Sequence, residues 1–225
     1  MAYPITDGIF DILLILGALA CTVLAFLIRE TRKVNFLKEH WSNITSGFGL
    51  IFFGRLLGAM SSIYQEPVFD FFQQIFRMVG IILLIIGLSA IRSNSEILVL
   101  KRYRASHRNL YYFIIFIVSL LVFGMALAIA KGIISGIDYV AFTQEAIIFE
   151  SYLILAFICL GIKDLKKEKS WDNIFTGFVI TALGSLLDVT HDFWAIAILG
   201  QLGGLIVIIG RIFLIVGFYS KWQER

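Results

Sequence analysis

The side chains best able to do chemistry in this chain are ionisable groups inside long apolar stretches. They are Asp11, Arg55, Arg77, Glu145, Glu150, Asp188, His191, Asp192 and Arg211. A charge in the hydrocarbon of a bilayer costs about 2.5–3.5 kcal/mol or more, so such groups normally face a bundle interior and mark binding sites or ion pathways. Each of them is therefore a candidate for holding a solute or an ion.

Six of these groups gather at one depth. Counted at about 1.5 Å per residue from the predicted helix ends, three lie within roughly 8 Å of the outer boundary and three lie about 12 Å deep. The first three are Glu145, Asp188 and His191; the second are Arg55, Arg77 and Glu150. The amides of Gln73, Gln74 and Gln201 share the layer, whereas Arg211 falls in the inner third. We expect a polar cavity that opens to the outer side.

A purely structural role would use the same residues. Arg55 and Arg77 would then pair with Glu150 and Asp188 as struts between helices, which would offset most of the cost of burying the charges. The two interpretations are compatible, because a network of ion pairs can line a cavity.

Metal binding and enzymology are not expected. His191 would need two or three further ligands for a metal, and no HxxxH or ExxH spacing supplies them. An interfacial role for His191, or a proton relay with Glu150, fits better. Gly-x-Ser-x-Gly and HExxH motifs are missing. The sequence therefore predicts a protein without catalytic residues, metal or cofactor.

The composition identifies a membrane protein. Hydrophobic residues make up 59% of the 225 and charged residues 16%, against roughly 25% charged in an average soluble domain. No stretch remains that could form a soluble domain or a nucleotide site. The net charge of +3 comes from loops and does not indicate nucleic acid. Cys21 and Cys159 lie within apolar segments and are expected to pack rather than to form a disulfide.

Apolar stretches of about 20 residues predict an all-α bundle of seven transmembrane helices. The expected helices are 8–28, 43–63, 69–91, 110–130, 142–162, 173–193 and 196–219. Pro4 and Pro67 both lie outside these spans, so proline breaks none of the helices.

An internal repeat organises the chain. Residues 41–92 and 171–222 align without a gap at an offset of 130, with identical residues at Trp41/Trp171, Asn43/Asn173, Ile44/Ile174, Gly47/Gly177 and Phe48/Phe178, among others. The repeat predicts a 3+1+3 layout: a first three-helix unit (1–92), a basic loop with a linker helix (93–137) and a second unit (138–225). Glycines at spacings of seven predict helix packing faces: Gly54, Gly80, Gly87, Gly184, Gly210 and Gly217.

Orientation follows from the basic residues. Loops 29–41, 92–109 and 163–171 are rich in lysine and arginine, and the loops on the other side carry mostly acidic residues. The positive-inside rule places the N-terminus outside and the C-terminus in the cytoplasm. The 92–109 loop mixes apolar and basic residues and could lie along the inner headgroups or dock a partner.

The 3+1+3 layout resembles the architecture of microbial opsins and of sugar-efflux-type transporters. The resemblance covers the whole chain and is one of architecture. An opsin holds retinal on a lysine of helix 7, where this chain has only Arg211 within 196–219. The transporters carry Pro-Gln loops, and the nearest segment here is Gln65-Glu66-Pro67.

Three functions remain open. The first is binding or transport of a small solute or ion through the outer cavity. The second is a receptor-like or sensor domain that signals to a separate cytoplasmic partner through the basic inner surface. The third is a non-catalytic subunit of a larger membrane complex, with the charges as struts. The expected partners are the lipid bilayer, a small solute or ion, and a membrane or cytoplasmic protein.

Overall fold

A computed structural model describes residues 5–32, 35–64, 66–99, 139–166, 168–194 and 197–224, and its regular structure in those ranges is all helical. The helices are α1 (Ile5–Thr31), α2 (Asn35–Tyr64), α3 (Pro67–Val99), α5 (Tyr139–Lys166), α6 (Lys169–Trp194) and α7 (Ala197–Gln223). The predicted linker helix 110–130 and most of the basic loop before it lie outside the described residues.

The helices are longer than predicted because polar turns at their ends are helical too. α2 begins at Asn35, eight residues before the predicted start at Asn43. Pro67 is the first residue of α3, a position where its missing N–H has no partner to lose. The Phe69 amide donates to the Glu66 carbonyl at 3.1 Å and closes the first turn.

All six described helices are long and apolar enough to cross a membrane, so the chain is an integral membrane protein with six candidate spans. Their outward faces carry exposed apolar side chains at spacings of three and four. On α3 these include Val68, Phe72, Ile75, Val79, Ile82 and Ile86, and on α7 Ile198, Leu202, Leu205, Ile209, Ile212 and Val216. The two sets are 130 residues apart, position for position. Such stripes suit contact with lipid chains.

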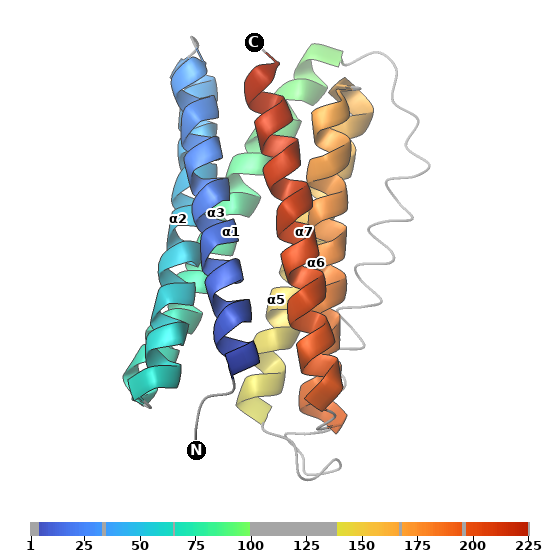
Figure 1. The fold of residues 1–225 in the computed structure, drawn as a ribbon. Helices are drawn as coiled ribbons and strands as arrows, with labels where there is room; N and C mark the ends of the chain where they lie inside the picture. The colour runs from blue at the N-terminus through green and yellow to red at the C-terminus, as the bar shows by residue number, and fades with distance from the viewer. Residues whose placement is uncertain are drawn as a thin grey trace.

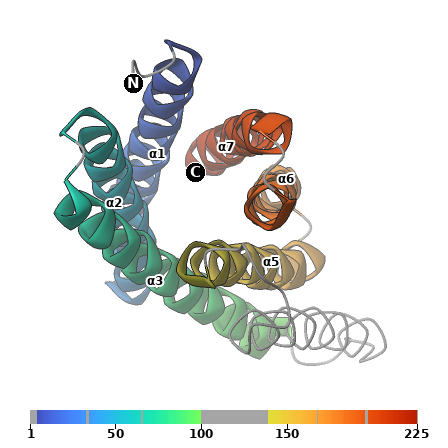
Figure 2. The ribbon, with the colours of Figure 1, turned by 90° about the horizontal axis from the view of Figure 1, so that it is seen from below.

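The described helices close into a ring. Each packs against two neighbours, in the order α1, α2, α3, α5, α6, α7 and back to α1 (Figure 2). α1, α3, α5 and α7 run in one direction and α2 and α6 in the other (Figure 1). The contacts between side chains agree: Arg77 meets Glu145 near the start of both α3 and α5, and Arg92 lies over Gly161 further along both helices.

Glycine allows close backbone contact at two helix interfaces of the ring, α2–α3 and α6–α7, which we call the glycine seams. A methyl group placed on Gly47 of α2 would lie 2.7 Å from the carbonyl oxygen of Gly80 on α3. A methyl group on Gly177 of α6 would lie 2.9 Å from the carbonyl oxygen of Gly210 on α7. Backbones this close are possible only without a Cβ. Four more predicted packing glycines also face a carbonyl oxygen of the neighbouring helix: Gly54, Gly87, Gly184 and Gly217.

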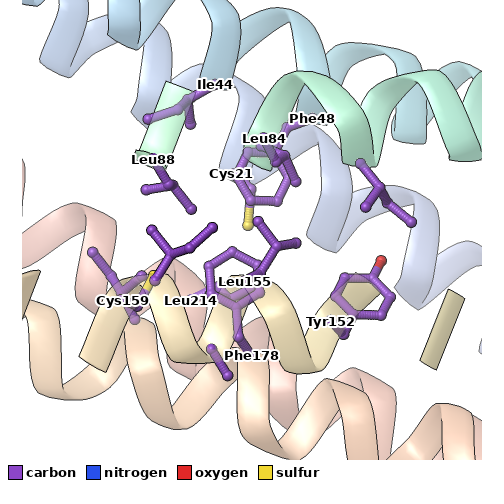
Figure 3. Packing of buried hydrophobic residues seen from close by; sticks show 14 of the residues in the cluster. Cys21, Ile44, Phe48, Leu84, Leu88, Tyr152, Leu155, Cys159, Phe178 and Leu214 are labelled. Carbon is purple, nitrogen blue, oxygen red and sulfur yellow. The ribbon is translucent and has the colours of Figure 1, made fainter. Parts of the chain in front are cut away.

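The inner part of the ring is a continuous apolar core (Figure 3). Phe48 and Phe178 are completely buried, and the Phe218 ring meets the Phe48 ring edge to face with centroids 5.4 Å apart. Cys21 and Cys159 lie in this core as free thiols, which confirms their predicted role as packing residues. The charged residues described next are therefore held in place by a rigid apolar surrounding.

Candidate functional site

One ion pair links α3 to α5. The Arg77 guanidinium donates from Nη1 to Oε1 of Glu145 at 3.2 Å. The side chains are 8% and 18% exposed, so water screens the pair little. Glu145 rather than Glu150 or Asp188 is thus the partner of Arg77, because α5 presents the earlier glutamate to α3. The second Glu145 oxygen, Oε2, is buried and has no hydrogen-bond partner among the described residues.

A cavity of about 220 Å³ lies where α1, α2, α6 and α7 meet. Three charged side chains from three helices line it: Asp11 of α1, Arg55 of α2 and Asp188 of α6. The rest of the lining is Phe10, Leu14, Gly200, Gln201, Gly204 and Val207. The cavity therefore combines three of the predicted site residues, Arg55, Asp188 and Gln201, with Asp11, which also stood out in the sequence.

The cavity exists because α7 carries small side chains where α3 carries large ones. Residues Gln73, Gln74 and Arg77 of α3 stand 130 positions before Gly203, Gly204 and Val207 of α7. An added methyl group on Gly204 would meet nothing within 4 Å. On α3 the corresponding volume holds long polar side chains, and Arg77 among them reaches Glu145. The shorter side chains of α7 leave the space open.

The same exchange of sizes turns Asp188 inward. On the first pair of helices the Gln73 amide lies over Gly58, whose added methyl group would be 2.6 Å from Gln73 Oε1. On the second pair the large and small positions are swapped, and the Asp188 carboxylate of α6 lies over Gly203 of α7. Only glycine at position 203 leaves room for that carboxylate, and from there it reaches the cavity wall.

Of the other predicted site residues, His191 lies beside the cavity wall, whereas Gln74 and Glu150 are not part of the lining. The His191 ring lies over Gly200, with Cδ2 3.2 Å from an added methyl group, and Gly200 is part of the cavity wall. Gln74 Oε1 is buried without a hydrogen-bond partner among the described residues. Glu150 lies on α5 and is not among the described residues that line the cavity.

Arg211 is the central polar residue that the depth argument had set aside. It is 2% exposed and donates from Nη2 to the Tyr152 hydroxyl at 3.1 Å. Its Nε and Nη1 are buried, and neither has a hydrogen-bond partner in the described part of the chain. The Phe48 ring lies 5.9 Å from the guanidinium carbon. Its spacing on α7 could have revealed this from the sequence: Arg211 follows Val207 by one helical turn and therefore lies on the same helix face as the cavity wall.

Tyr152 of α5 is the hydrogen-bond partner of Arg211 of α7. Its ring stacks on Phe178 with centroids 6.4 Å apart. One side chain of α5 therefore contacts both Arg211 of α7 and Phe178 of α6.

A separate ion network joins the start of α6 to the end of α7. The Lys221 ammonium, 5% exposed, pairs with Glu168 and with Glu224, the latter at 2.8 Å. The Ser170 hydroxyl donates to Glu224 at 3.0 Å, and the Trp171 indole donates to Glu168 at 3.1 Å. Burial raises the pKa of Glu224, but the hydrogen bonds from Lys221 and Ser170 outweigh it, so that its pKa lies below the usual 4.5. α7, which extends beyond the predicted end at 219, thus does contain a lysine, in its last turn and held in this network.

No group of three or more histidine, cysteine or acidic side chains in the described ranges is placed to hold a metal ion. No protein-family model, curated protein or solved structure matches the chain. Function must therefore be argued from the cavity and its charges.

Proposed function

We propose that this protein binds a small polar solute or ion in the cavity between α1, α2, α6 and α7, and that it takes up or transports this ligand from the outer side of the membrane. The observation that carries the proposal is the meeting of Asp11, Arg55 and Asp188 at one cavity wall inside a membrane bundle. Charges are costly at that depth and are kept where they serve a pathway or a site.

The proposal includes a seven-helix, 3+1+3 architecture. α3 and α5 run in the same direction (Figure 1), as a further span between them requires. The glycine seams also support the duplication, since Gly47 meets Gly80 as Gly177 meets Gly210. In this view the protein has one cavity, placed away from the axis that relates the two copies, because the polar residues differ between the copies.

The proposed orientation places the cavity toward the outside. Lysine and arginine are concentrated at the other end of the bundle, where α1 ends, α2 begins and α5 meets α6. The positive-inside rule assigns that end to the cytoplasm. Gly200 and Gln201 near the start of α7 then lie at the outer mouth.

The direct test is a binding screen on purified protein. Ions, sugars, amino acids and lipids are added one at a time and the melting temperature is recorded, because a ligand that binds only the folded state raises it. Leu14→Trp fills the cavity, and Arg55→Leu and Asp188→Asn remove its charges. Arg29→Leu and Asp164→Asn are matched changes on the exposed inner end.

The expected result is a stabilising ligand whose effect is lost in the three cavity variants and kept in the two controls. Uptake of that ligand into proteoliposomes then separates transport from binding alone. If no ligand acts, and the cavity variants differ from the controls only in stability, the proposal is wrong. The subunit role would then be the better account of these charges.

A further inference from the structure

The charges of the cavity region are layered along the membrane normal. Counted from the outer helix ends at 1.5 Å per residue, Asp11 and Asp188 both lie about 9 Å deep. Arg55 lies about 14 Å deep and Arg211 about 21 Å. Arg55 and the two aspartates line the cavity, and Arg211 follows Val207 of the cavity wall by one helical turn. Acidic groups thus form the outer layer and basic groups the inner one.

The inner layer contains hydrogen-bond donors without a partner among the described residues. Arg55 Nε, Arg211 Nε and Arg211 Nη1 are buried without a hydrogen-bond partner among the described residues. A buried donor left unpaired is destabilising, and more so when the group is charged. Among the ion pairs formed by described residues, neither arginine has a carboxylate within 4.0 Å, whereas Arg77 does. Of the two, Arg55 lines the cavity, and an anionic group on a ligand there would supply the partner that its donor lacks.

The cavity has the size and lining for a small molecule with a short apolar part. An apolar cavity of about 150 Å³ holds benzene, so about 220 Å³ holds a ligand somewhat larger. Phe10, Leu14 and Val207 offer apolar surface beside the charged groups. A plain inorganic anion would leave this surface unused, and it would meet the aspartates first.

We infer that the ligand is a small zwitterion of the amino-acid type. Its ammonium group binds at Asp11 and Asp188, and its carboxylate points inward to Arg55, with Arg211 one turn below. Guanidinium groups bind carboxylates through paired, charge-assisted hydrogen bonds. The inference rests on the proposed binding function and names the chemical class that the cavity selects.

The experiment compares an amino acid with its own derivatives. The twenty amino acids, betaine and taurine are first screened by thermal shift. The best binder is then titrated calorimetrically beside its amide, which lacks the carboxylate, and its N-acetyl form, which lacks the ammonium. Losing one charge-assisted hydrogen bond of about 1.5–3 kcal/mol corresponds to about 10- to 150-fold weaker binding. Each derivative should therefore bind at least about tenfold more weakly than the parent compound.

The variants assign each charge to its residue. Arg55→Gln should abolish the preference for the acid over the amide, and Asp188→Asn the preference for the free amine over the N-acetyl form. Arg55→Lys keeps the charge and covers the case in which Arg55→Gln does not fold. Arg29→Gln, at the exposed end of α1, should change neither preference.

The outcomes separate the two proposals. If the amide and the N-acetyl form bind as well as the amino acid, the zwitterion inference is wrong and the cavity remains a binding site. The same holds if none of the screened zwitterions acts but a sugar or an inorganic ion does so in a manner lost in Leu14→Trp. If nothing in either screen stabilises the protein, both proposals fail together.

Discussion

Alanine at Gly210 should weaken the bundle, whereas alanine at Gly204, six residues away on the same helix, should not. A methyl group on Gly210 would lie 2.8 Å from the Thr181 amide nitrogen and 2.9 Å from the Gly177 carbonyl oxygen, besides contacting the Thr181 hydroxyl. Backbone atoms cannot rotate away, so α6 and α7 would have to separate. A methyl group on Gly204 meets nothing within 4 Å.

The size of the effect follows from comparing the two variants. Both gain the same helix propensity, about 1 kcal/mol for glycine to alanine in water. The difference between them is therefore the cost of overpacking, about 1–3 kcal/mol. For a chain of this size 1 kcal/mol shifts the melting temperature by about 2–4 °C, so Gly210→Ala should melt roughly 2–12 °C below Gly204→Ala.

The assay is thermal unfolding of purified protein in detergent, followed by labelling of the free thiols. Cys21 and Cys159 are completely buried, so a thiol reagent reacts with them only as the core opens. Gly80→Ala repeats the test on the α2–α3 seam, where the added methyl group would lie 2.6 Å from the Gly47 carbonyl oxygen. Equal melting temperatures for Gly210→Ala and Gly204→Ala would refute the reasoning about close backbone approach.

Two further predictions concern ion pairs. Arg77→Met or Glu145→Leu alone should lower the unfolding free energy by about 3–5 kcal/mol, because the partner is left buried and unpaired, while the double variant recovers most of it; additive losses in a double-mutant cycle would contradict the pairing. Just past the end of α7, the depressed pKa of Glu224 contributes stability above its usual pKa of 4.5, and this is lost as the pH falls through the lower folded-state value. Melting temperature against pH should therefore drop on acidification in the parent protein and less so in Glu224→Gln; identical profiles would rule out this contribution.

The spans were predictable because apolar length is a local property. All six described helices coincide with predicted ones, and their extra turns escaped prediction because polar helical ends carry no hydropathy signal. α2, for example, is helical through Lys38 and Glu39, which no measure of apolar length would include.

The pairing of the charges could not be predicted in the same way. Which glutamate meets Arg77 depends on the order and rotation of helices in the ring. Depth alone placed Glu150 in the layer of Arg77, whereas the structure pairs Arg77 with Glu145. Depth also placed Arg211 apart from the outer groups, and it gave no indication that Arg211 would meet Tyr152 of α5. The cavity itself arises from what is missing on α7, at Gly200 and Gly204, and a search for polar residues does not detect missing side chains.

The glycine seams bear on how this chain enters the membrane during synthesis. α2 and α6 are the least apolar of the six spans, and both carry inward charges, Arg55 and Asp188. Each is bound closely to a strongly apolar successor, α3 or α7, which leaves the ribosome directly after it. A weak span that leaves the insertion machinery together with such a successor exposes its polar face to the neighbouring helix rather than to lipid. The α6–α7 hairpin, rather than α6 alone, is then the unit of insertion, because the Asp188 carboxylate lies over Gly203 of α7 and is shielded by that helix.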